Sequence, residues 1–119
     1  MTSTPTAHAS VFLPQSLKDH PQIDAFLETL EGMGSQVAWL AERSESGITS
    51  VYKSLKGVQR GAVTVIADTA EDLQAASLMY GIACLGMVGA DLNGMSDMLA
   101  TGERVVVGLE NLARHFTVR

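Results

Sequence analysis

The sequence has one cysteine and few aromatic residues, and both shortages limit what the protein can be. Cys84 is alone among 119 residues, so no disulfide can form within the chain, and a reducing cytoplasm is the expected compartment. Its apolar neighbours Ile82 and Leu85 predict a buried, unreactive thiol with a raised pKa. Aromatic residues make up 5% of the chain. Aliphatic side chains must therefore fill the core, which favours packed helices over a β-sandwich.

Basic residues are also scarce. Eight lysines and arginines stand against thirteen acidic residues, giving a formal charge of −5. The densest basic group is Lys53, Lys56 and Arg60, and no aromatic stacking platform accompanies it. Because nucleic-acid phosphates repel a protein of this charge, we expect no nucleic-acid partner.

Motifs of catalytic, metal and cofactor sites are missing as well. The histidines His8, His20 and His115 have no HExxH spacing, and no serine lies in a GxSxG elbow. The glycines between residues 81 and 89 resemble a phosphate loop only superficially, because the residues between them are apolar. We therefore expect no enzyme activity, no catalytic residue, no metal and no cofactor.

The N-terminal segment, residues 1–16, lacks charged residues and is rich in serine and threonine. This composition, with Pro5 and Pro14, predicts a flexible leader. A single helical domain, residues 17–119, is expected to follow it. The segment is also compatible with an uncleaved export signal. Residues 9–13 could become extended beside a sheet edge.

Three later segments have apolar residues at the three- and four-residue spacing of a helix. They are residues 23–41, 48–58 and 95–116. Gly32 and Gly34 indicate a kink or a turn in the first, and Ser44 or Ser46 could cap the second. Residues 91–94, DLNG, predict a turn, and Gly102 divides the last segment, in which residues 105–107 could instead form a strand.

Residues 62–67, AVTVIA, fit either a buried strand or a continued helix. We favour the helix, because a parallel strand needs neighbours and the chain offers only residues 9–13 and 105–107. Thr69 then precedes Glu71 and Asp72, and together with Asp68 these residues predict the capped N-terminus of another helix.

Residues 73–90 form an eighteen-residue uncharged stretch with three glycines. Read as a helix, the stretch is apolar on opposite sides and must be covered on both. It reaches the lower limit for a membrane span, but polar residues dilute it and no lysine or arginine lies between Arg60 and Arg104 to anchor it.

Together these patterns predict an all-α fold: a small bundle of three to five helices that is dimeric or bound to a partner. We expect a non-enzymatic, cytoplasmic protein–protein interaction module whose partner is a second copy or another protein. The expected interface comprises Leu73, Ala76, Tyr80, Gly81, Ala83, Gly86 and Met87.

Two alternatives stay open. In the first, the protein is exported or membrane-active and inserts the helix at 73–90. In the second, it is a small α/β nucleotide binder or enzyme in which residues 62–67 are a strand and Asp68 to Asp72 lie at its carboxyl end, where such sheets bind ligands.

Overall fold

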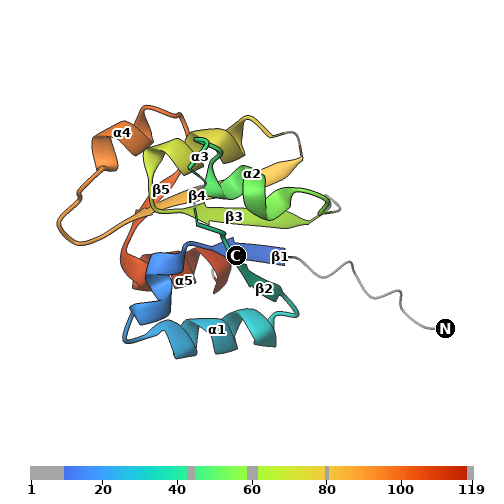
Figure 1. Ribbon diagram of the computed structural model, residues 1–119. Helices are drawn as coiled ribbons and strands as arrows, with labels where there is room; N and C mark the ends of the chain where they lie inside the picture. Colours follow the sequence, from blue (N-terminus) through green and yellow to red (C-terminus); the bar gives the residue numbers. More distant parts are fainter. Residues whose placement is uncertain (1–9, 43–44, 59–61, 80, 118–119) are drawn as a thin grey trace.

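The computed structural model describes residues 10–42, 45–58, 62–79 and 81–117, and it shows an α/β fold around a parallel five-stranded sheet (Figure 1). The predicted all-α helical bundle is therefore wrong. The elements are β1 (Ser10–Leu13), the 3-10 helix η1 (Gln15–Asp19), α1 (Ile23–Gly32), β2 (Gln36–Trp39), α2 (Ser50–Leu55), β3 (Val63–Ala67), α3 (Ala70–Ser77), β4 (Ile82–Val88), α4 (Met95–Leu99), β5 (Val105–Val107) and α5 (Gly108–Thr117).

The strands lie in the order β2-β1-β3-β4-β5, and every neighbouring pair is parallel. The chain runs outward from β1 to β2, then returns past β1 to β3 and continues in the other direction. This is the flavodoxin-like order of doubly wound sheets, and its direction reverses between β1 and β3.

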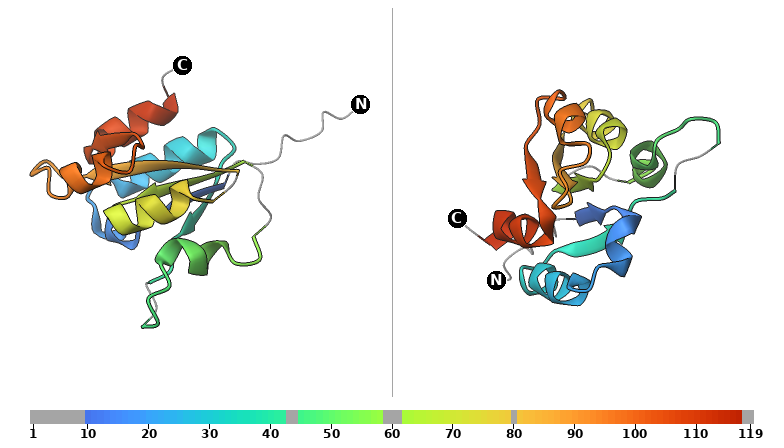
Figure 2. Two further views of the ribbon diagram at one scale, coloured as in Figure 1. Left: turned by 90° about the horizontal axis from the view of Figure 1, so that it is seen from above. Right: turned by 90° about the vertical axis from the view of Figure 1, so that its left-hand side faces the viewer.

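Helices cover both faces of the sheet (Figure 2). On one face, Phe26 and Leu30 of α1 join Leu109 and Leu112 of α5 in one core cluster. On the other face, side chains of α2, α3 and α4 pack against the sheet in two further clusters. Apolar residues on both sides of the sheet are thereby removed from water, which is the condition for a parallel sheet.

The predicted helix at residues 62–67 is wrong, because Val63–Ala67 forms the central strand β3. Val65, Ile66 and Ala67 are completely buried, so this strand shows no alternation of apolar and polar residues. Its partners are β1, which begins in the predicted leader, and β4. The segment expected to lack neighbours therefore has two.

The predicted helix at residues 73–90 is also wrong. α3 ends at Ser77, and the chain turns through Gly81, whose φ of 80° suits glycine, before β4 begins at Ile82. The stretch is apolar on opposite sides because it joins a buried helix face to a strand covered on both faces. The helix that the membrane-insertion alternative requires at residues 73–90 is thus a shorter helix followed by a strand. No helix in the described ranges is long and apolar enough to cross a bilayer.

Other predictions are confirmed in part. The first helical pattern is α1, a turn at Gly34 and then β2, while α2 is capped by Thr49 rather than by the expected serines. The turn at residues 91–94 is confirmed. The helix favoured at residues 105–107 is wrong, because Val105–Val107 forms the strand β5, which was the alternative. Of the predicted leader, residues 1–9 lie outside the described residues, and the chain belongs to the sheet from Ser10 on.

Candidate ligand pocket at the carboxyl ends of the strands

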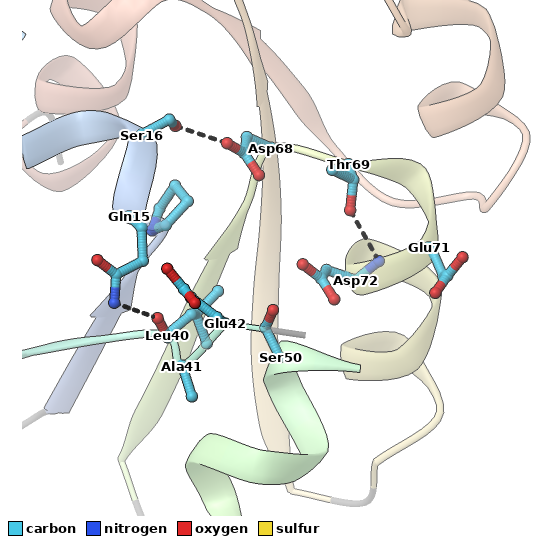
Figure 3. Close-up of a pocket in the computed structure, with 11 residues that line it drawn as sticks. Gln15, Ser16, Leu40, Ala41, Glu42, Ser50, Asp68, Thr69, Glu71 and Asp72 are labelled. Carbon is cyan, nitrogen blue, oxygen red and sulfur yellow. Dashed lines mark hydrogen bonds between the residues drawn. The ribbon is translucent and has the colours of Figure 1, made fainter. Parts of the chain in front are cut away.

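The loops that follow β1, β2 and β3 enclose a pocket of ≈ 350 Å³ (Figure 3). The loops contribute Pro14, Gln15 and Ser16 after β1, Leu40, Ala41 and Glu42 after β2, and Asp68 and Thr69 after β3, while Ser50, Glu71 and Asp72 come from α2 and α3. The pocket therefore lies where the strand order reverses between β1 and β3. Connections leave neighbouring strands in opposite directions there, and doubly wound proteins bind their ligands in the resulting crevice.

Hydrogen bonds tie the three loops to one another. Ser16 Oγ donates to Asp68 Oδ2 at 2.5 Å and so links the loop after β1 to the loop after β3. Gln15 Nε2 donates to the carbonyl oxygen of Leu40 at 2.9 Å, which links the first loop to the one after β2. The pocket walls are thus held by contacts between loops that are far apart in the sequence.

A further pair of hydrogen bonds joins the loop after β2 to α2. The backbone N–H of Ala41 donates to Ser54 Oγ at 2.7 Å, and Ser54 Oγ donates to the carbonyl oxygen of Ser50 at 2.6 Å. Ser50, which lines the pocket at the start of α2, is itself buried. This wall of the pocket is therefore fixed by the first turns of a helix as well as by loop contacts.

Among the described residues that line the pocket, every charged side chain is a carboxylate: Glu42, Asp68, Glu71 and Asp72. Figure 3 shows Glu42 and Asp72 pointing into the space between the loops, whereas Glu71 points away from it. A cluster of one sign raises the local negative potential and attracts cations. Among the described residues, however, no three acidic, histidine or cysteine side chains are close enough together to hold a metal ion.

Asp72 is the carboxylate most affected by its surroundings. Burial raises the pKa of Asp72 above its ordinary 3.8, and the negative charges of Asp68 and Glu71 raise it further. Hydrogen bonds with the Thr69 hydroxyl and the Ser50 backbone lower the pKa in part. The ionised form is therefore under-compensated, and a cation placed beside it would offset the repulsion.

The predicted capping role of this acidic segment is confirmed. Thr69 is the N-cap of α3, and its Oγ1 accepts a hydrogen bond from the backbone N–H of Asp72 at 3.2 Å. Glu71 and Asp72 lie in the first turn, where the helix dipole favours negative charge. The second role of this segment, as a pocket wall, belongs to the α/β alternative, because it depends on residues 62–67 being a strand.

The residues predicted to form an interface do not share one surface. Leu73 and Ala76 are completely buried in the core, and Gly86 is buried within β4. Gly81 and Ala83 are exposed and Met87 is half-buried, whereas Tyr80 lies outside the described residues. The continuous helix on which the predicted interface was based does not exist. A role for any of these residues in association stays a prediction.

The single cysteine lies outside the pocket, on β4. Cys84 is half-buried, and burial, together with a hydrogen bond and charge repulsion from Glu103, raises the pKa of its thiol to about 12. The direction of the predicted pKa shift is thus confirmed, whereas the predicted full burial of the thiol is wrong. At neutral pH almost none of this thiol is the reactive thiolate.

Comparison with models of known protein families, with curated proteins and with solved structures gives no match. The geometry and charge of the pocket are therefore the basis for a functional assignment.

Proposed function

We propose that this protein binds a small organic cation, such as an amine or a guanidinium compound, in the pocket at the carboxyl ends of β1, β2 and β3. The supporting observation is that the pocket lies at the reversal of strand order and that all charged side chains among its described lining residues are carboxylates. The proposal is one of binding without a catalytic step, in a cytoplasmic protein as the single cysteine suggests.

This charge pattern favours an amine over a nucleotide. Phosphate sites in doubly wound folds use exposed backbone N–H groups and the positive end of a helix. Here the first turn of α3 already contains Glu71 and Asp72, and the described lining residues include no lysine, arginine or histidine. The carboxylates would therefore repel a phosphate. The pocket has the location expected for the α/β alternative, but its charge favours a cationic ligand over the anionic nucleotide of that alternative.

An ammonium or guanidinium group also suits the hydrogen-bonding groups of the pocket. Ionised carboxylates only accept hydrogen bonds, and these cations only donate them. A hydrogen bond with a charged partner is worth roughly 1.5–3 kcal/mol. Contact with Asp72 would additionally relieve the repulsion that Asp68 and Glu71 exert on it.

Calorimetric titration of the full chain with putrescine, a diamine, tests the proposal, and AMP serves as the anionic comparison. The informative variant is Asp72→Asn, which removes one charge from the pocket and preserves the side-chain shape. Glu28→Gln is the control, because Glu28 is exposed on α1 and lies on the opposite face of the sheet from α2 and α3.

We expect putrescine to bind and AMP not to bind at low salt. Asp72→Asn should weaken putrescine binding about tenfold, equivalent to about 1.4 kcal/mol, whereas Glu28→Gln should change it less than about twofold. Binding of AMP in place of the diamine would contradict the proposal, as would equal affinities of the two variants.

A further inference from the structure

A second feature lies at the far edge of the sheet, away from the carboxylate pocket. β5 is the last strand in the order, and within the described residues no strand pairs with its outer side. A shallow groove of ≈ 450 Å³ runs along β5 and α5, and its polar lining comes from Arg104, Asn111, Arg114 and His115. The groove therefore combines an open strand edge with two positively charged arginines, whereas the pocket has carboxylates.

The register of β5 defines which backbone groups face outward. The N–H of Gly86 donates to the carbonyl oxygen of Arg104 at 2.8 Å, and Gly86 is the register partner of Val105. In a parallel ladder, alternate residues direct their backbone groups to opposite neighbours. The N–H and C=O groups of Val105 and Val107 therefore point away from β4.

One of these outward groups already has a partner. Asn111 Nδ2 donates to the carbonyl oxygen of Val107 at 2.7 Å. The N–H and C=O of Val105 and the N–H of Val107 remain directed toward the groove. This alternation of donor and acceptor is the pattern that an added strand requires.

The charge of the groove differs from that of the whole protein. The chain has a formal charge of −5 and eight lysines and arginines, and two of these, Arg104 and Arg114, line this groove. The described lining residues include no acidic residue. Arg114 also pairs with Glu110 at 3.2 Å, but both side chains are largely exposed, and a guanidinium has five N–H donors. Both arginines can therefore contact another molecule.

We infer that the open edge of β5 binds an acidic, extended peptide segment of a partner protein as an added strand. Main-chain hydrogen bonds to Val105 and Val107 would supply affinity, and Arg104 and Arg114 would select acidic side chains. A second copy of the chain is a poorer occupant, because two β5 edges would bring the arginines of both copies to one interface. The proposal places protein association on this edge rather than on residues 73–90.

Binding is tested with the full chain and a short, end-blocked peptide of alternating glutamate and valine. A peptide of alternating lysine and valine is the charge control. Amide hydrogen exchange of the protein reports whether the N–H groups of Val105 and Val107 become protected. Sedimentation of the free chain reports whether a second copy already occupies the edge.

Charge reversal on the protein gives the matched comparison. Arg104→Glu combined with Arg114→Glu should weaken binding of the acidic peptide at least tenfold, because the new negative charges repel its glutamates. Both residues are exposed, so their replacement leaves the core intact. Lys53→Glu, on the exposed side of α2, should change affinity less than about twofold. Thermal unfolding of each variant confirms that it is folded.

Protection of Val105 and Val107 by the acidic peptide, lost in the double variant, would support the inference. The inference would be overturned by absence of binding at millimolar peptide, by equal binding of the lysine peptide or by protection elsewhere in the chain. A dimer in which these two amides are already protected would also overturn it and assign the edge to a second copy.

Discussion

Asp72 is subject to two effects that act on the stability of its ionised form in opposite directions. In the first turn of α3 its charge is favourable to the helix dipole, and its backbone N–H is capped by Thr69. Toward the pocket, burial and two neighbouring carboxylates raise its pKa. The effects that raise the pKa outweigh those that lower it. The folded state therefore holds the proton of Asp72 more tightly than the unfolded chain does.

This imbalance predicts the direction of a pH effect. The pKa of Asp72 in the folded state lies above 3.8. The stabilisation of the fold that comes from its protonated carboxyl is therefore fully present below pH 3.8, and it is lost as the pH rises through the folded-state pKa. At pH 7, Asp72→Asn should therefore increase the free energy of unfolding relative to the unmodified protein, and the gain should shrink near pH 4. Urea unfolding at the two pH values measures this, with Glu28→Gln as the control expected to change little. A loss of stability at pH 7 in Asp72→Asn would mean that the hydrogen bonds from Thr69 and Ser50 outweigh the burial.

Among the elements, α3 and β4 were the hardest to predict, because they lie within one uncharged stretch of the sequence. The sequence predicts that Gly86 lies in an interface with another chain. In the structure it is a position in β4 where the side chain of Leu73 in α3 lies against the strand: a Cβ at Gly86 would be 2.9 Å from Leu73 Cδ2 and 3.2 Å from Val105 Cγ2. The close neighbours of Gly86 therefore belong to the same chain, and its role in an interface stays a prediction.

Replacement of glycine by alanine at two positions should therefore have opposite effects. Leu73 is completely buried and has little room to move, so Gly86→Ala should destabilise the protein by about 1–3 kcal/mol through overpacking. Gly32 ends α1, and a Cβ added there would meet no neighbouring side chain within 4 Å, so Gly32→Ala should be neutral or stabilising by up to about 1 kcal/mol. Urea unfolding compares the two variants. Equal effects would show that β4 and α3 are less closely packed than described.

Local signals predicted the cap of α3 and the turn after β4 better than they predicted the strands. Thr69 with its following acids and the turn at residues 91–94 depend on neighbours in the sequence, and the structure contains both. The pairing of β3 depends on β1 and β4, so its evidence is spread over segments that look like a leader and a helix. Parallel strands covered on both faces also lack the alternation that identifies a strand in sequence.

At the scale of the whole molecule, strand order explains what local patterns could not. The pocket brings together loops after three strands, and the reversal between β1 and β3 exists only once β1, β2 and β3 are placed beside one another in the sheet. The sequence could therefore indicate the acidic segment at residues 68–72 but not Gln15, Ser16 and Glu42, which complete the pocket from segments far away. The same strand order leaves β5 at one edge, far from the central strand β3.

The position of each strand in the sheet predicts how fast its amides exchange with solvent. β3 has strands on both sides and completely buried side chains at Val65 and Ile66, so its amides should exchange only through global unfolding. The outward amides of Val105 and Val107 on β5 should exchange at least about 1000-fold faster, because they need no such opening. Native-state hydrogen exchange followed by NMR measures both sets in one experiment on the free chain. Comparable protection of β5 and β3 would require that the edge is covered in the free protein, which would leave no open strand for an acidic peptide to join.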